Sequence, residues 1–212
     1  MIISRRGCAL TIVAALASLS LVTLPLAPAA LAVTPAKKLP AQLPTRADTH
    51  IYMMRGLFGV FSQGIDALAA ELTQTGYQAE VYDWSAWEQV ASTIAQRYQG
   101  GHRGPVVIIG HSLGANAVIN VATNLLTQEI PVELGVTFDA TDPGQVPDNV
   151  AMFINFWAKD GFGQPVQPAP DYTGQLQNFD LSGQPGIDHT TIDSMEPFHQ
   201  LVITKLDDMT AD

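Results

Sequence analysis

Cysteine is nearly absent from this sequence of 212 residues, which contains one, Cys8. A single thiol cannot form a disulfide within the chain. It also cannot supply the clustered cysteine ligands of a structural zinc site. We therefore expect no intrachain disulfide, no metal and a fold that depends on its hydrophobic core.

Charged residues are also scarce, at 14% of the chain against about 25% in an average globular protein. Acidic residues outnumber basic ones by 20 to 10, which gives a formal net charge of -10. A surface of this sign repels phosphate backbones and anionic lipid headgroups, so we predict no nucleic-acid partner and no electrostatic membrane docking. Apolar residues make up 47% of the chain, which excludes wholesale disorder, and the length favours one domain.

The first 32 residues have the three parts of a secretory signal peptide. Arg5 and Arg6 provide the positive start, an apolar run covers residues 8–26, and Ala30 and Ala32 fit an A-x-A cleavage site. The alternative is an uncleaved membrane anchor, but two prolines near the end of the run and the cleavage pattern favour removal. We therefore expect an exported protein, periplasmic or secreted, without a stable membrane span after cleavage.

Residues 33–48 contain three prolines and predict an extended linker or an arm on the surface. From residue 49 to residue 212, short apolar runs alternate with longer segments that have apolar residues at helical spacing. This alternation predicts an α/β domain in which a mostly parallel central sheet carries helices on both faces. The expected strands are 51–54, 78–84, 105–109, 134–138, 150–157 and 176–181, and the expected helices are 62–75, 85–98, 113–127 and 195–208.

A G-x-S-x-G motif, Gly110-His111-Ser112-Leu113-Gly114, lies directly between the most apolar predicted strand and a predicted helix. At such a junction a serine is held on a tight, strained turn with its hydroxyl exposed. The glycines are needed because a Cβ at either position would collide with the neighbouring strand or helix. The N-terminus of the following helix favours an oxyanion. This placement predicts a nucleophilic serine rather than a bystander in a structural turn.

With this motif in this place, the chain resembles a small α/β-hydrolase of the compact lipase and esterase kind. Gly-His-Ser-Leu-Gly is the form that the nucleophile elbow of that family most often takes. The resemblance extends from about His50 to Asp208 through the order of the elements. It implies a minimal α/β-hydrolase fold without a large lid and with no metal or organic cofactor. It also implies a triad in which serine, acid and histidine follow one another along the chain.

The order of that triad requires a histidine after Ser112. His189 lies in a loop just before the last predicted helix, where the catalytic histidine of the family usually lies. His199 falls within that helix and is the alternative. We expect His189 to be the base.

For the acid of the triad we expect Asp139, which ends a predicted strand. Its side chain should emerge at the carboxyl edge of the sheet, beside Ser112. Asp160 follows the next strand, in the commonest position of the family, and Asp142 lies three residues after Asp139. Both remain alternatives.

The resemblance also implies an oxyanion hole made of two backbone N–H groups. One belongs to Leu113, directly after the nucleophile, and the other to the loop after the first core strand, where we expect Leu57, or Phe58 as its neighbour. This loop has Arg55-Gly56 where the family usually has His-Gly. We expect Phe58 and His111 to contact the substrate, although a histidine at the latter position more often packs or orients.

Together these features predict a serine hydrolase that cleaves carboxylic esters of small molecules or lipids through an acyl-enzyme on Ser112. The same triad could attack a thioester or an amide, or pass the acyl group to an acceptor other than water. A non-catalytic binding protein of the same fold is a further alternative. The segment 159–175, rich in glycine and proline, is the one candidate for a flap over the site.

Overall fold

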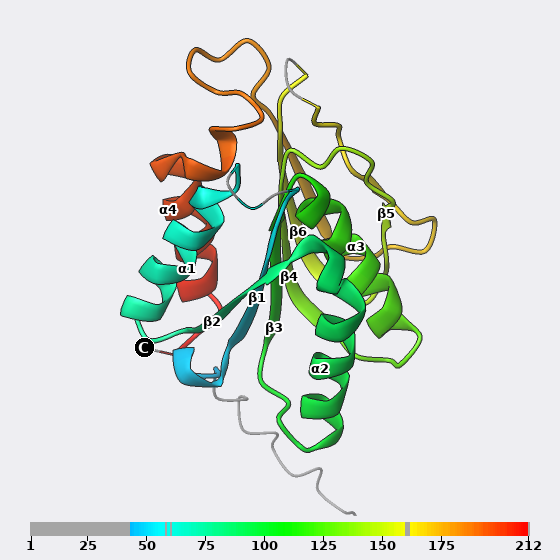
Figure 1. Cartoon of the computed structure of the whole chain (residues 1–212). Coiled ribbons are helices and arrows are strands. Elements are labelled where there is room, and N and C mark those ends of the chain that lie inside the picture. Colours follow the sequence, from blue (N-terminus) through cyan, green and yellow to red (C-terminus); the bar gives the residue numbers. More distant parts are fainter. Residues whose placement is uncertain (1–42, 58, 60, 160–161, 212) are drawn as a thin grey trace, which may run out of the picture. The chain divides into compact units, whose positions relative to one another are not determined.

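Figure 1 shows the computed structural model, which describes residues 43–57, 59, 61–159 and 162–211. The predicted signal peptide and most of the predicted linker lie outside these ranges. The described end of the linker is folded: Arg46–Asp48 form a 3-10 turn, and Arg46 pairs with Asp207 at 3.1 Å. The Ala211 N–H donates to the Pro44 carbonyl at 3.0 Å. Within the described ranges, no helix combines the length and apolar character needed to cross a membrane.

Six strands form the central sheet, in the order β2-β1-β3-β4-β6-β8, and each neighbouring pair is parallel. The predicted parallel sheet is therefore confirmed, and its carboxyl ends meet at one edge. All residues of the central strand β3 are buried, as expected for a parallel strand covered on both faces. The strands are β1 (His50–Arg55), β2 (Gln78–Asp83), β3 (Val106–His111), β4 (Val132–Phe138), β6 (Val150–Trp157) and β8 (Gln175–Asp180).

Two helices cover each face of the sheet (Figure 1). Alternate side chains of β1 divide between the two cores because successive residues of a strand point to opposite faces. Tyr52 and Met54 pack with α2 and α3, whereas Ile51 and Met53 pack with α1 and α4. The helices are α1 (Gln63–Gln74), α2 (Trp87–Gln99), α3 (Leu113–Leu126) and α4 (Glu196–Asp207).

The predicted elements differ from the observed ones at short irregular segments. A 3-10 turn (η2, Trp84–Ala86) precedes α2, so this helix begins two residues later than its apolar spacing predicts. Two strands of two residues each, β5 (Gln145–Val146) and β7 (Gln167–Pro168), form a small second sheet. Segments of this length carry no periodic signal, which is why the sequence did not reveal them.

The described part of the segment 159–175 is attached to the domain rather than free. The Gln164 N–H donates to the Ala140 carbonyl at 3.0 Å, and the Val166 N–H donates to Asn178 Oδ1 at 2.9 Å. These bonds and the β5–β7 pairing do not support the prediction that this segment is a flap.

The order of the strands in the sheet determines where a ligand site can lie. β1 and β3 are neighbours, but the helices that follow them, α1 and α3, cover opposite faces of the sheet (Figure 1). At such a switch point the loops diverge and leave a crevice at the carboxyl ends of the strands, where ligands of open α/β sheets bind. The G-x-S-x-G motif lies at this point.

Candidate active site

Ser112 occupies a sharp turn between β3 and α3, with φ 58° and ψ -122°. A positive φ is strained for a residue with a side chain, and it is the conformation expected of a nucleophile on an elbow. The glycines of the motif are required on steric grounds. A Cβ on Gly110 would lie 2.3 Å from the Gly114 carbonyl oxygen, and one on Gly114 would lie 2.1 Å from that of Met54.

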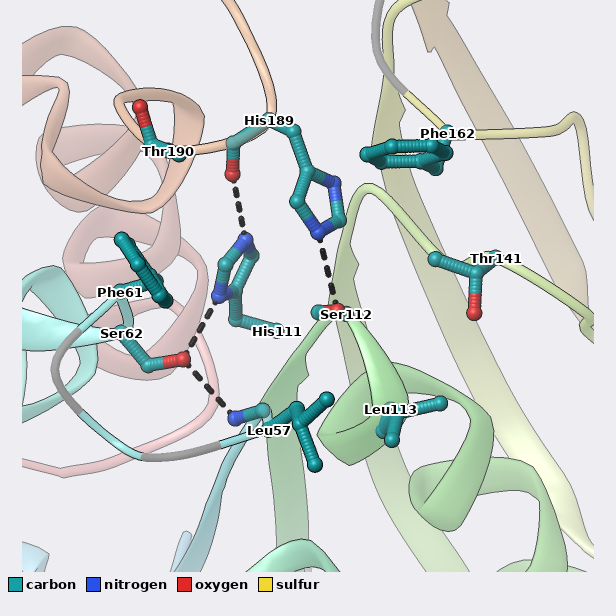
Figure 2. Close-up of a pocket in the computed structure, with 11 residues that line it drawn as sticks. Leu57, Phe61, Ser62, His111, Ser112, Leu113, Thr141, Phe162, His189 and Thr190 are labelled. Atoms are coloured by element: carbon teal, nitrogen blue, oxygen red, sulfur yellow. Dashed lines mark hydrogen bonds between the residues drawn. The ribbon is translucent and has the colours of Figure 1, made fainter.

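His189 approaches Ser112 from the loop between β8 and α4. Its Nε2 lies 2.9 Å from Ser112 Oγ, and its Nδ1 lies 2.5 Å from Asp139 Oδ2 (Figure 2 shows the first contact). A carboxylate only accepts hydrogen bonds, so Nδ1 carries the proton and donates to Asp139. Nε2 is then the acceptor for the serine hydroxyl. This is the tautomer that a general base requires.

Asp139 is fully buried at the end of β4 and has a φ of 53°. Its Oδ1 accepts the Ala158 N–H at 2.9 Å, and its Oδ2 accepts the Phe162 N–H at 3.2 Å in addition to the imidazole. A Cβ on Gly163 would lie 1.8 Å from Asp139 Oδ1, so only a glycine fits there. Backbone amides therefore compensate the buried carboxylate for the loss of water.

The two described alternatives for the triad, His199 and Asp142, are not among the residues that line the cavity at Ser112. His199 is buried in α4, where its Nε2 donates to the Asp193 carbonyl at 2.7 Å and its Nδ1 lies 3.2 Å from Glu71. Asp142 is exposed, and Asp160 lies outside the described residues. Glu71, Glu196 and His199 bring three potential metal-ligand atoms within 4.8 Å of one another, but this group is not part of the cavity at Ser112.

A cavity of about 410 Å³ opens beside Ser112. Its rim carries exposed apolar side chains: Leu57 is 45% exposed, Phe61 53% and Phe162 69%. Of the described residues that line the cavity, none is a lysine or an arginine. They are Gly56, Leu57, Phe61, Ser62, His111, Ser112, Leu113, Thr141, Phe162, His189 and Thr190.

The two residues predicted to form the oxyanion hole, Leu57 and Leu113, both line this cavity, whereas Phe58 lies outside the described residues. Leu113 is the first residue of α3, so its N–H has no partner within the helix. The loop of Leu57 packs closely on the nucleophile, because a Cβ on Gly56 would lie 2.8 Å from Ser112 Cβ. Both amides are therefore near the serine.

The predicted contact of His111 with substrate is not supported by its surroundings. The side chain belongs to the cavity wall but is only 1% exposed, and both ring nitrogens are bonded within the protein. Its Nδ1 lies 2.8 Å from Ser62 Oγ, and its Nε2 lies 2.7 Å from the His189 carbonyl oxygen. Neither ring nitrogen is therefore left to bond to a ligand, and contact of His111 with substrate stays a prediction.

Burial lowers the pKa of His111 to about 4, which predicts a pH effect on folding. Between pH 4 and the ordinary histidine pKa of about 6.5, the unfolded chain binds a proton at this residue and the folded chain does not. The His111 contribution to stability is therefore complete above pH 6.5 and is lost as the pH falls toward 4.

The matched comparison uses His111→Gln, which cannot titrate. From pH 7 to pH 5, wild type should lose about 2 kcal/mol of unfolding free energy relative to the variant. Urea unfolding of both proteins at the two pH values measures this difference. A constant difference would show that His111 does not titrate as its burial requires.

Two buried polar residues near the site had no motif in the sequence. Ser62 precedes α1 and contacts His111, while Asp193 follows the histidine loop. Asp193 Oδ2 accepts the N–H of Ile65, in the first turn of α1, at 3.2 Å. Burial raises the pKa of Asp193 to about 6. Spacing could not indicate either contact, because the partners are 49 and 128 residues apart.

No protein-family model matches the sequence, and no curated protein matches it. Solved structures do match. The type II thioesterase BorB from the borrelidin biosynthetic cluster has a TM-score of 0.50 at 12% identity, over 77% of this chain and 95% of that one. RedJ, a thioesterase from the prodiginine biosynthetic pathway in Streptomyces coelicolor, has a TM-score of 0.48 at 12% identity, over 85% and 98%. Alpha/beta hydrolase domain-containing protein 10 from mouse has a TM-score of 0.43 at 11% identity, over 75% and 88%.

Identities this low concern the fold alone. The parallel sheet, the helices on both faces and the elbow at the end of β3 define an α/β-hydrolase fold, and the likeness to BorB agrees. The protein therefore has the α/β-hydrolase fold in a minimal form, as the sequence predicts.

Proposed function

We propose that this protein is a serine hydrolase that cleaves carboxylic esters through an acyl-enzyme on Ser112. One observation carries the proposal: a continuous hydrogen-bonded series from Ser112 Oγ to His189 Nε2 at 2.9 Å and from His189 Nδ1 to the buried Asp139 at 2.5 Å. Nucleophile, base and orienting acid in this arrangement are the parts that acyl transfer requires.

In the first step His189 Nε2 takes the proton of the Ser112 hydroxyl as the oxygen attacks the acyl carbon. The carbonyl oxygen becomes negative, and the amides of Leu57 and Leu113 stabilise it. Asp139 holds the imidazole in place and stabilises its cationic form. The imidazolium then gives its proton to the leaving alcohol, and the carbon–oxygen bond to that alcohol breaks.

In the second step water attacks the acyl-enzyme with His189 again as the base. The tetrahedral intermediate forms against the same two amides, and Ser112 leaves with the proton from His189. The acid product and the free enzyme result. The residues named here supply each proton transfer.

The cavity favours an uncharged ester with an apolar acyl group. Leu57, Phe61 and Phe162 offer apolar contact area beside the nucleophile. Its described lining offers no lysine or arginine to a phosphate, and the net charge of -10 repels anions. A neutral alcohol as leaving group therefore suits the site better than a phosphorylated thiol carrier. BorB is a thioesterase, so thioesters belong in the test.

The test compares one butyryl group on three leaving groups: 4-nitrophenol, N-acetylcysteamine and coenzyme A. We expect kcat/KM to be lowest for the coenzyme A thioester, because its phosphates meet no cation in the described lining. A fluorophosphonate probe should label Ser112, located by mass spectrometry of the peptide. Preference for coenzyme A would contradict the proposed leaving group, and failure to label Ser112 would favour a binding protein.

We also propose that the protein is exported, since residues 1–32 have the composition of a signal peptide. Expression of the full chain in a bacterial host should yield a mature protein that begins at Val33. N-terminal sequencing of protein from the periplasm or the medium checks this. Recovery of the intact N-terminus in the membrane fraction would indicate an anchor instead.

A further inference from the structure

Ser62 and His111 are buried next to Ser112 and bond to each other (Figure 2). We call this hydrogen-bonded pair, with its bonds to Gly56 and His189, the relay. The His189 carbonyl oxygen can only accept, so His111 Nε2 carries a proton and donates to it at 2.7 Å. His111 Nδ1 is then an acceptor, and the Ser62 hydroxyl donates to it at 2.8 Å. Ser62 Oγ in turn accepts the Gly56 N–H at 2.8 Å. Each of these polar groups thus has one defined role.

The two ends of the relay lie on the two loops that the proposed reaction must align. Gly56 directly precedes Leu57, whose N–H belongs to the proposed oxyanion hole. The other end is the backbone carbonyl of His189, whose imidazole is the proposed base. The centre, His111, is bonded covalently to Ser112. The relay therefore joins the nucleophile to both of its partners through one rigid, neutral imidazole.

The position of Ser62 supports a dedicated role. Ser62 is the N-cap residue of α1, where a serine usually accepts an N–H of its own helix, yet its side chain makes no such bond. The N–H of Ile65 donates instead to Asp193, which lies in the 3-10 turn η3 (Ile192–Ser194) after His189. The Ser62 hydroxyl is thereby left for Gly56 and His111. Ser62 and His111 are both buried, so water cannot replace either partner.

We infer that Ser62 and His111 are positioning residues that set the location of the His189 ring and of the Leu57 amide relative to Ser112. This inference rests on the proposed function. Neither side chain has a polar atom free for substrate, so their loss should change kcat far more than KM. Misplacement of reacting groups by about 1 Å can cost about 100-fold in rate.

The experiment measures kcat and KM for 4-nitrophenyl butyrate in Ser62→Ala, His111→Phe and the double variant. We expect kcat to fall about 10- to 100-fold in His111→Phe with KM changed less than about 3-fold. Ser62→Ala should show a smaller fall of the same kind. The double variant should be no slower than His111→Phe, because both changes break one relay.

Two further variants distinguish a positioning role of His111 from a general loss of rigidity in the protein. His111→Gln keeps an amide N–H that reaches toward the His189 carbonyl, so it should recover part of the kcat lost in His111→Phe. His50→Phe removes a half-buried histidine at the opposite end of β1, where its Nδ1 lies 3.2 Å from an Arg97 Nη atom, outside the cavity. It should reduce the melting temperature but keep kcat within about 3-fold of wild type.

The outcomes distinguish this inference from the proposed function. If the wild-type protein neither hydrolysed esters nor was labelled at Ser112, the proposed function itself would be wrong. An active wild type with full kcat in Ser62→Ala and His111→Gln would overturn the relay, even if His111→Phe failed to fold. Equal losses of kcat in His111→Phe and His50→Phe would also overturn it, since they would indicate a general loss of rigidity and not a local effect on the site.

Discussion

Ser112→Ala should lower kcat for ester hydrolysis by roughly 10⁶-fold, the loss found when a serine protease is deprived of its nucleophile or its base. Alanine removes the oxygen that attacks the acyl carbon and leaves the rest of the site in place. The cavity and the two loop amides remain, so substrate should still bind. Stopped assays with 4-nitrophenyl butyrate measure the loss, and the fluorophosphonate probe should no longer label the protein.

Two further variants of the same protein serve as controls for this prediction. Ser194→Ala changes an exposed serine in the 3-10 turn that follows the histidine loop, and kcat should stay near wild type. A Ser112→Ala/His189→Ala double variant should be no slower than either single variant, since residues that act as a unit do not add their effects. If Ser112→Ala kept even a tenth of the wild-type rate, the nucleophile would have to be another residue.

The features of the site that the sequence predicts are those set by local pattern and by the direction of strands. The elbow at Ser112 follows from a β-branched run, two glycines and a helix, all within a few residues. Asp139 and His189 follow because parallel strands end at one edge, so residues just after them converge. The structure brings these three side chains into direct contact. Their catalytic roles remain predictions.

Other parts of the site depend on contacts that no short pattern encodes. The relay of Ser62 and His111 spans 49 residues, and its link to His189 spans another 78. The sequence therefore suggested substrate contact for His111, because it could not show that both ring nitrogens already have protein partners. The glycine at position 163 carried no signal either. Only the structure shows that position 163 requires glycine, because the Asp139 carboxylate occupies the space that a Cβ there would fill.

Asp139→Asn should lower kcat by about 10⁴-fold, as the corresponding change does in the Ser-His-Asp proteases. Asp139 accepts three N–H groups: that of Ala158 at Oδ1, and those of Phe162 and His189 at Oδ2. An asparagine must place an NH₂ group at one of these oxygens. If it faces His189, it donates to Nδ1 and forces the proton onto Nε2, which then repels the Ser112 hydroxyl proton. If it faces Ala158, two donors meet in a buried space.

The companion variants are Asp142→Asn and Asp160→Asn, at the other two candidate positions for the acid. Asp142 is exposed, and a surface substitution of this kind changes little, so Asp142→Asn should keep kcat within about 3-fold of wild type. Asp160→Asn should do the same, because Asp139 already supplies the acid of the proposed triad. A large loss in Asp160→Asn with near-normal activity in Asp139→Asn would move the acid to the loop after β6.

Folding and catalysis must be separated for Asp139, because a buried donor without a partner also costs about 1–3 kcal/mol of stability. The rate of fluorophosphonate labelling makes this separation, since it requires proton removal from Ser112 in the fraction of protein that is folded. Labelling should slow in proportion to kcat at temperatures well below the melting point. Loss of stability alone would lower the melting temperature and leave the labelling rate of the folded protein unchanged. The two measurements together therefore decide whether Asp139 acts on the imidazole or only supports the fold.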